Sequence, residues 1–131
     1  MTDQELVERA FSMHRFSYVP YSKFPVGAAL LCSDGTVFTG CNVENAAFGS
    51  TICAERTALL KAVSEGRRDG WVAIAIAGRG SDYCWPCGSC RQMLYEFAPN
   101  LRVLAARGDG TFRTAALKEL LPYGFGPKSL E

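Results

Sequence analysis

The sequence has little net charge and no extended run of one sign. Fourteen Lys and Arg residues oppose 13 Asp and Glu residues, the formal net charge is +1, and the longest basic run is the pair Arg67-Arg68. Proteins that bind a polyanion usually carry a basic stripe. The composition therefore argues against nucleic acid as a partner and favours a small, weakly charged molecule.

Long apolar runs are also missing. No segment approaches the ~18 uninterrupted apolar residues of a membrane-spanning helix. The first residues, MTDQELVERAFSMHRF, mix charged and apolar side chains and lack the apolar run of a signal peptide. We therefore expect no membrane partner and a cytoplasmic location, where thiols stay reduced.

Linkers, repeats and low-complexity segments are absent, so residues 1–131 are expected to form one domain. Histidine is scarce: His14 is the only one, and it lies on the apolar stripe of the first predicted helix, where a core or edge position is favoured over metal binding. Cysteine is plentiful, with six residues. In a reducing compartment this number favours metal binding or catalysis over disulfides.

The predicted elements follow the order αββαβαββα. Helices are expected over residues 3–16, where Thr2 and Glu5 can form a capping box, and over 53–65, ended by Gly66. The run WVAIAIAG (71–78) is typical of a central strand buried on both faces, and Asp34-Gly35 predicts a hairpin turn. We therefore predict a three-layer α/β/α fold with a five-stranded mixed sheet. The remaining predicted elements are strands 26–33, 36–41, 101–107 and 111–115 and helices 86–97 and 115–121.

Three cysteines have the spacing of ligands for one metal ion. Cys87 and Cys90, in PCGSCRQ (86–92), lie one helical turn apart, so both sulfurs can reach one ion. Cys53, in TICAER (51–56), begins the other long predicted helix. If both helices start at the same edge of the sheet, the three thiols converge there. Zinc takes four ligands, so three protein ligands would leave one position for water, as in catalytic sites.

Cys84 could instead complete a closed, structural zinc site. Because Trp85 precedes Pro86, its backbone is pushed toward extended conformations, which places Cys84 off the helix, although its sulfur could still fold back. A non-catalytic zinc module and a redox protein that uses CGSC therefore remain as alternatives. The redox interpretation leaves Cys53 without a role.

Glu55 follows Cys53 by two residues and projects to a different side of the first helical turn. Its carboxylate can therefore face the open position of the metal without binding the ion. There it can take a proton from water and deliver it to a leaving group. In isolation Glu55 would be explained by the helix dipole; beside three thiols it is a candidate catalytic residue.

These motifs resemble the paired motifs of the zinc-dependent cytidine deaminase family, in its small form with three cysteine ligands. The resemblance implies one Zn²⁺ per subunit held by Cys53, Cys87 and Cys90. It also implies a cytidine deaminase-like fold and hydrolytic deamination of cytidine and deoxycytidine, with Glu55 protonating N3 and the departing ammonia. It covers nearly the whole chain, through CAERTALLKAVSEG, PCGSCRQMLYEF, VPYSKFPVGAALL, GCNVENAAF and ELLPYGFGP.

The resemblance also implies the substrate contacts. Asn42 and Glu44 match residues that hydrogen-bond the ribose hydroxyls, and a carboxylate there would repel a phosphate, which favours free nucleosides. Phe24 matches the aromatic residue that packs on the pyrimidine ring, and the N–H of Ala54 matches the donor to its O2 carbonyl. Phe125 matches a residue that closes the site of a neighbouring subunit, so a homotetramer with shared sites is expected.

Three thiolates should hold the water proton of the zinc site more tightly, and the two helix N-termini and Arg56 can offset this effect. In the small deaminases that this chain resembles, the Arg at this place hydrogen-bonds the cysteine ligands, a role we assign to Arg56 as a hypothesis. Phe48 stands where many relatives have Tyr, and Cys84 and Trp85 are bulkier than expected. Pocket shape and the choice among cytidine, deoxycytidine and analogues such as a nucleoside antibiotic therefore stay open.

Overall fold

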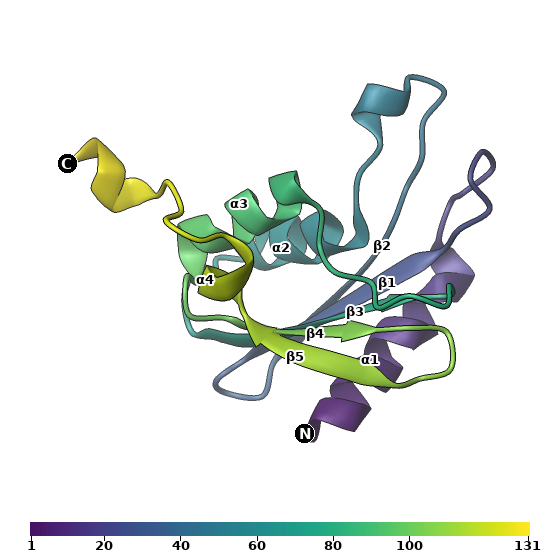
Figure 1. Cartoon of the computed structure of the whole chain (residues 1–131), viewed down its shortest axis with the longest axis horizontal. Helices are drawn as coiled ribbons and strands as arrows, with labels where there is room; N and C mark the ends of the chain where they lie inside the picture. The colour runs from purple at the N-terminus through teal and green to yellow at the C-terminus, as the bar shows by residue number, and fades with distance from the viewer.

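A computed structural model describes all 131 residues and shows one five-stranded mixed sheet between layers of helices (Figure 1). The strands are β1 (Val26–Cys32), β2 (Val37–Cys41), β3 (Trp71–Gly78), β4 (Arg102–Ala106) and β5 (Phe112–Ala116). The helices are α1 (Asp3–Phe11), α2 (Ala54–Ser64), α3 (Gly88–Phe97) and α4 (Leu117–Leu120), with 3₁₀ turns η1 (Ser12–Phe16), η2 (Phe48–Ser50) and η3 (Pro127–Leu130).

The strands lie in the order β2-β1-β3-β4-β5, with β3 and β4 parallel and the other neighbours antiparallel. Along β3 the side chains alternate: Ile74 and Ile76 pack in the cluster formed with α2 and α3, whereas Ala73, Ala75 and Ala77 pack in the cluster formed with α1. The strand is buried on both faces, as its apolar run predicts. The three-layer α/β/α fold and the predicted element order are confirmed.

The first helix is shorter than predicted. Thr2 caps α1 as expected, because its Oγ1 accepts the N–H of Glu5 at 3.1 Å. The α-helix ends at Phe11 rather than residue 16, and the chain continues as η1, where the Oγ of Ser12 donates to the carbonyl of Arg9 at 2.6 Å. His14 Nε2 lies 2.7 Å from the carbonyl oxygen of Ala77, so His14 holds η1 to β3. This contact agrees with the core or edge position predicted for His14.

Two other predicted boundaries are wrong. Helix α3 begins at Gly88 rather than Pro86, because Cys87 takes an extended backbone and caps the helix. The last helix begins at Leu117 rather than residue 115, because Ala115 and Ala116 pair with β4. Sheet pairing here overrides the high helix propensity of alanine.

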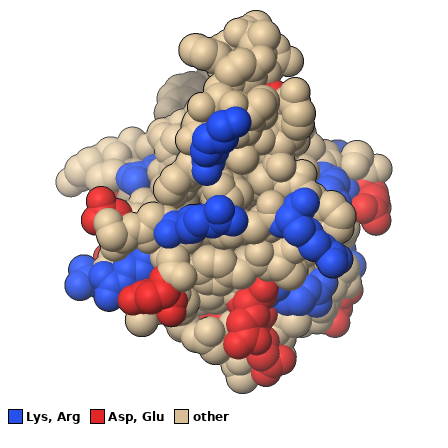
Figure 2. Space-filling model, turned by 90° about the vertical axis from the view of Figure 1, so that its right-hand side faces the viewer, with Lys and Arg blue, Asp and Glu red and all other residues tan.

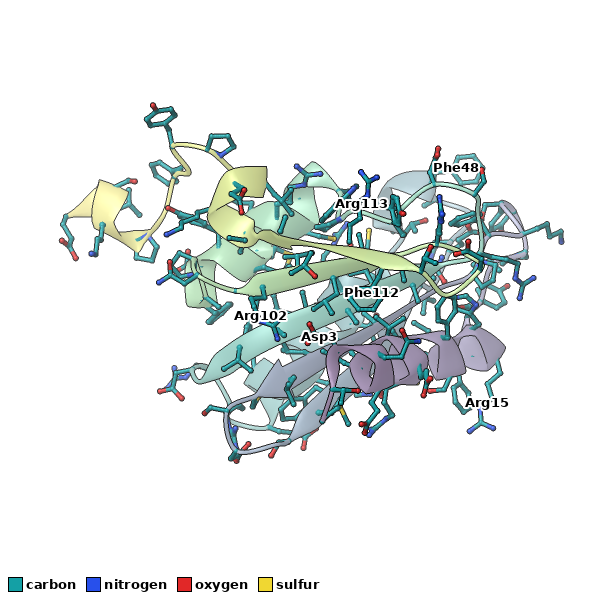
Figure 3. The ribbon with its side chains drawn as sticks, turned by 60° about the horizontal axis from the view of Figure 1, so that its bottom comes forward. Asp3, Arg15, Phe48, Arg102, Phe112 and Arg113 are labelled. Atoms are coloured by element: carbon teal, nitrogen blue, oxygen red, sulfur yellow. The ribbon has the colours of Figure 1, made fainter.

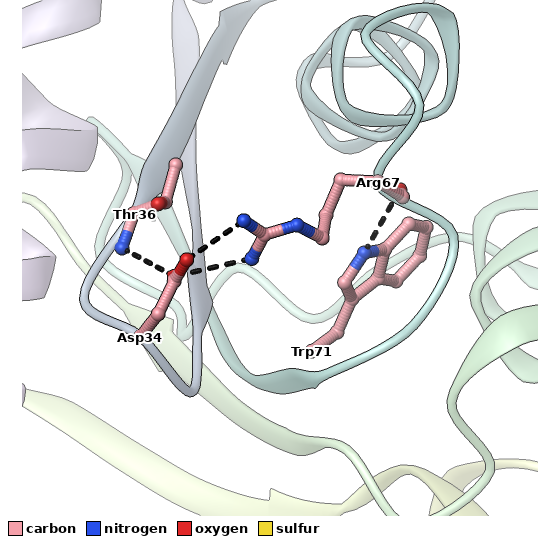
Figure 4. A network of polar contacts seen from close by, with 4 residues as sticks. All are labelled: Asp34, Thr36, Arg67 and Trp71. Carbon is pink, nitrogen blue, oxygen red and sulfur yellow. Dashed lines mark hydrogen bonds and ion pairs between the residues drawn. The ribbon is translucent and has the colours of Figure 1, made fainter.

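The predicted hairpin turn forms at Asp34-Gly35, where Gly35 has a φ of 91° that favours glycine. Figure 4 shows how this turn is tied to the segment after α2. The two guanidinium nitrogens of Arg67 donate to the two carboxylate oxygens of Asp34, at 3.1 and 2.7 Å, and the carbonyl of Arg67 accepts the indole N–H of Trp71. This network lies on the surface and holds the hairpin against the start of β3.

Basic and acidic side chains are interspersed with uncharged surface on the face shown in Figure 2. One ion pair joins distant parts of the chain: Arg102 of β4 contacts Asp3 at the start of α1 at 3.0 Å (Figure 3). None of the helices has both the length and the apolar character that crossing a bilayer would require.

Candidate metal centre and substrate cavity

The N-termini of α2 and α3 meet on one face of the sheet and bring three thiols together. Cys53 is the N-cap of α2, Cys87 is the N-cap of α3, and Cys90 lies in the first turn of α3. The sulfur of Cys87 lies 3.8 Å from that of Cys53 and 3.3 Å from that of Cys90. All six cysteines of the chain are free thiols. The convergence predicted from the two helix starts is therefore present.

The sheet fixes where α2 begins. A Cβ at Gly40 of β2 would lie 2.4 Å from the carbonyl oxygen of Ala54 and 2.6 Å from the nitrogen of Ala58. Only glycine therefore lets the first turn of α2 rest this closely on β2. The hydroxyl of Thr57 adds a hydrogen bond of 3.0 Å to the carbonyl of Cys41, which binds the same turn to the end of β2.

The three sulfurs fit a zinc ion. Zn–S bonds of about 2.3 Å in a tetrahedron place two sulfurs about 3.8 Å apart, and all three sulfurs here lie within 4.8 Å of one another. Cys84 does not belong to this group. Cys53, Cys87 and Cys90 could therefore hold a metal as three ligands, with the fourth tetrahedral position left to a molecule other than these thiols.

Arg56 supports this cluster electrostatically. Its Nη2 donates to the sulfur of Cys53 at 3.5 Å. The pKa of Cys53 falls to about 5, mainly through the hydrogen bond from Cys90 and then through the hydrogen bonds from Arg56 and Cys87. The hydrogen bonds of Arg56 to Cys53 and Cys90 in turn raise the pKa of Arg56. A thiolate, the form that binds metals, is thus favoured at Cys53.

Glu55 points into the interior beside these thiols, although it is a charged residue type. Its side chain is only 4% exposed, and burial raises the pKa of its carboxyl to about 7. A carboxyl whose pKa lies near neutrality can both accept and donate a proton at ordinary pH. Glu55 therefore has the properties of a general acid–base.

A cavity of about 190 Å³ opens onto Glu55 and onto two of the three clustered thiols, Cys53 and Cys87. Its lining brings together Ala54 at the start of α2, Asn42 after β2, and the segment Cys84-Trp85 that precedes α3. The backbone N–H groups in the first turn of a helix have no partner within the helix, so the N–H of Ala54 is available to a bound molecule. The cavity thus offers a carboxyl, a helix N-terminus and a cluster of thiols to one ligand.

Asn42 and Glu44 hold the 18–26 loop in place. The Oδ1 of Asn42 accepts the N–H of Val26 at 3.0 Å, and its Nδ2 donates to the carbonyl of Phe24 at 2.9 Å. One carboxylate oxygen of Glu44, Oε1, accepts the N–H groups of Tyr21 and Ser22 at 3.0 and 3.1 Å. These contacts leave Asn42 one further N–H and Glu44 its Oε2.

Two aromatic residues predicted to bind substrate lie outside the lining of this cavity. The tip of the Phe24 ring packs against the backbone of Gly78 and Gly80, at the end of β3. Phe125 lies on the C-terminal tail, which projects from the body of the molecule (Figure 1), and its side chain is 57% exposed. Phe48 projects from the 42–51 loop (Figure 3), is 72% exposed, and contacts the ring of Tyr21.

Sequence reasoning missed Arg91 and Gln92, which follow Cys90 directly. Arg91 donates to the carbonyl of Pro86 at 2.7 Å and to that of Leu120 at 2.8 Å, so it fixes the segment before α3 and the end of α4. Gln92 donates to the carbonyl of Phe125 at 2.7 Å and holds the tail. Charged and amide residues near the start of a helix are common, so the only available signal was their place in the motif.

Comparison with known proteins gives consistent matches. Residues 1–106 match the family model of the cytidine and deoxycytidylate deaminase zinc-binding region. The chain is 48% identical to a cytidine deaminase of Halalkalibacterium halodurans over 126 residues, which cover 95% of each protein. It is 42% identical to a cytidine deaminase of Sporosarcina psychrophila over 131 residues, which cover 99% of this chain and 96% of that protein.

Solved structures show a similarity to the same family. The fold matches a crystal structure of cytidine deaminase from Burkholderia pseudomallei with a TM-score of 0.92 and 45% identity, covering 95% of this chain and all of that one. A cytidine deaminase of Mycobacterium tuberculosis matches with a TM-score of 0.82 and 38% identity, covering 96% of this chain and 99% of that one. The cluster of thiols described above is chemically suited to the zinc that the family model specifies.

Proposed function

Because the chain belongs to the cytidine and deoxycytidylate deaminase family, we propose that it is a zinc-dependent cytidine deaminase. It adds water to cytidine or deoxycytidine and releases ammonia, giving uridine or deoxyuridine. The single observation that carries this function is the buried carboxyl of Glu55 in a cavity whose wall contains the sulfurs of Cys53 and Cys87.

Cys53, Cys87 and Cys90 hold the zinc, which when bound lowers the pKa of water so that a nucleophile exists at neutral pH. Glu55 takes one proton of the attacking water on its carboxylate and passes it to N3 of the pyrimidine. It then takes the second proton of that oxygen, now bonded to C4, and delivers it to the amine, which leaves as ammonia as the C4–N bond breaks and the C4 carbonyl forms. The N–H of Ala54 donates to the O2 carbonyl and fixes the orientation of the ring. Burial of Glu55 supports this role, because it raises the pKa of the carboxyl to about 7, where the group can both accept and donate a proton.

The sugar lies toward Asn42 and Glu44 and packs beside the loop that carries Phe24. The remaining N–H of Asn42 and Oε2 of Glu44 are suited to the ribose hydroxyls, which donate and accept hydrogen bonds. Hydrogen bonds from Ser22 and Tyr21 lower the pKa of the Glu44 carboxyl, which keeps it ionised. A fixed negative charge there disfavours a 5′-phosphate, so free nucleosides are the substrates.

The protein acts as a homotetramer in which Phe125 closes the site of a neighbouring copy. Support comes from exposed aromatic and aliphatic side chains on the projecting tail, namely Tyr123, Phe125 and Leu130. Light scattering gives the mass in solution, and Phe125→Ala should lower activity without loss of zinc.

The free state of all six cysteines suits a reducing compartment, so the enzyme works in the cytoplasm, in the salvage of pyrimidine nucleosides.

The direct test is to follow ammonia release from zinc-loaded protein with cytidine, deoxycytidine, CMP and a cytosine-containing single-stranded oligonucleotide. Turnover of the two nucleosides with little turnover of CMP or the oligonucleotide is expected. Turnover of none of the four would contradict the proposed activity and return the chain to the class of structural zinc modules.

A further inference from the structure

Cys84 has no part in the chemistry above, yet its side chain stands in the wall of the cavity. It lines the same space as Glu55 and Cys53 but lies outside the group of three sulfurs. We propose that Cys84 is a specificity-determining residue whose side chain limits the size of the base that can enter beside Glu55. This inference rests on the proposed function, since it takes the cavity to be the place where the base binds.

Cys84 packs directly against the backbone of Gly78. A Cβ at Gly78 would lie 3.1 Å from both the Cβ and the sulfur of Cys84, and 3.3 Å from the tip of the Phe24 ring. No side chain therefore separates Cys84 from the end of β3. Gly78 itself is paired with Val26 of β1, so the surface behind Cys84 is part of the sheet. The side chain of Cys84 therefore has no room to move toward β3.

The backbone of Cys84 is fixed as well. Its N–H donates to the carbonyl of Ala106 at 3.2 Å, which ties it to the end of β4. Two residues later Pro86 is fully buried, and its carbonyl accepts the hydrogen bond from Arg91. The segment is thus held at both ends. A ligand that is too large for the cavity therefore cannot push the backbone of Cys84 aside without breaking these contacts.

The size of the cavity makes a single side chain decisive. At about 190 Å³ it is small for a ligand site, and Cys84 and Trp85 are consecutive contributors to its wall. In a close-fitting pocket one extra methyl or methylene group changes discrimination about 10- to 200-fold. A change at Cys84 should therefore alter which cytosine nucleosides are accepted rather than whether the protein has activity.

The experiment compares kcat/KM for cytidine, 5-methylcytidine and N4-methylcytidine. These two analogues place a methyl group on neighbouring positions of the base. Cys84→Ala should raise the ratio of at least one analogue to cytidine by on the order of tenfold. Cys84→Val should lower that same ratio, and Cys84→Ser, whose hydroxyl is smaller than the thiol, should give a value between those of Cys84→Ala and the wild type. Cys32→Ala, which removes a buried thiol that is not in the cavity wall, is the matched control and should change no ratio.

Zinc content and Tm are measured for every variant, so that loss of folding is separated from a change in selectivity. If Cys84→Ala fails to fold, the proposal is tested by Cys84→Val alone, in which the ratio of analogue to cytidine should fall. Ratios that match the wild type in the Ala and Val variants would overturn the role of Cys84 while leaving the deaminase activity intact.

An independent readout separates this proposal from the proposed function. Equilibrium binding of cytidine and the two analogues is measured by calorimetry in zinc-loaded Glu55→Ala, with and without Cys84→Ala. If the wild type turns over no nucleoside, the proposed function fails, and relative affinities that shift with Cys84 still support the size limit. Relative affinities that do not shift with Cys84→Ala, or no binding of any of the three nucleosides, would overturn the size limit proposed for Cys84.

Discussion

The guanidinium of Arg56 donates a hydrogen bond to the sulfur of Cys53 over 3.5 Å, from the first turn of the helix that Cys53 caps. Its Nε is buried without a hydrogen-bond partner. A buried N–H donor without a partner destabilises the folded state, and the fold tolerates this destabilisation at Arg56. The position of Arg56 is therefore set by its contact with the thiol cluster rather than by solvent.

Arg56→Gln should weaken zinc binding or turnover by about 10- to 100-fold, the usual effect of removing a group that orients metal ligands. Zinc retention against a competing chelator and kcat for cytidine measure the two effects. Arg68→Gln, a change at an exposed arginine near the end of the same helix, is the control. Full zinc retention and full activity in Arg56→Gln would contradict the role.

Glu55→Ala should keep its zinc and lose turnover by about 10²- to 10⁴-fold, because general acid–base catalysis typically contributes this much. The measurements are bound zinc and ammonia release on the same preparation. Glu65→Gln, at an exposed carboxylate after α2, should behave as the wild type. A Glu55→Ala enzyme that retains most of its kcat would remove Glu55 from the mechanism.

Glu44→Gln should increase the ratio of kcat/KM for CMP to that for cytidine by on the order of tenfold. Two like charges about 4 Å apart repel by roughly 1 to 4 kcal/mol near a protein surface, and the substitution removes one of them. The Gln side chain still carries an oxygen for the N–H groups of Tyr21 and Ser22, so the loop should stay in place. An unchanged ratio would show that the carboxylate does not exclude phosphate.

Arg91→Ala should lower the free energy of unfolding by about 2 to 4 kcal/mol, because two charge-assisted hydrogen bonds to the carbonyls of Pro86 and Leu120 are lost. Denaturant unfolding of the zinc-loaded protein measures this. Arg91→Lys, which can keep one of the two bonds, should fall between Ala and the wild type. Equal stabilities of all three proteins would show that these contacts contribute nothing.

Asp34→Ala should lower Tm at neutral pH without changing activity, since the Asp34–Arg67 pair lies in the β1–β2 hairpin network, outside the cavity. Arg67 holds the pKa of Asp34 below its ordinary value. A lowered pKa gives stabilisation that is complete above the unfolded-state pKa of about 4 and is lost as pH falls through the lower, folded-state pKa. The Tm difference should therefore shrink in strong acid; a difference that is constant with pH would contradict the ionic origin.

The sequence was sufficient for the architecture and for the convergence of Cys53, Cys87 and Cys90, because both follow from local rules. Apolar periodicity marks the central strand, and thiols at two helix starts meet once those helices share an edge of the sheet. The exact helix ends were not predictable in this way. Ala116, which was predicted to be helical only, joins β5 because β4 offers it a partner, which is information that the local sequence does not contain.

The contacts that fix the site were the least predictable part. Arg91 and Gln92 act on carbonyl groups of Leu120 and Phe125, far along the chain, and backbone carbonyls carry no sequence signature. The hold of Glu44 on the 18–26 loop is of the same kind, since it joins a side chain to backbone N–H groups. Such contacts depend on the final packing of the chain, which no local pattern encodes.

X-ray absorption at the zinc edge of the purified protein tests the central claim most directly. Three sulfur ligands at about 2.3 Å and one lighter ligand, oxygen or nitrogen, at about 2.0 Å are expected from Cys53, Cys87 and Cys90 with one position open to solvent or substrate. Four sulfur ligands, with Cys84 or another thiol completing the tetrahedron, would contradict the account, because no position would then remain for the reaction.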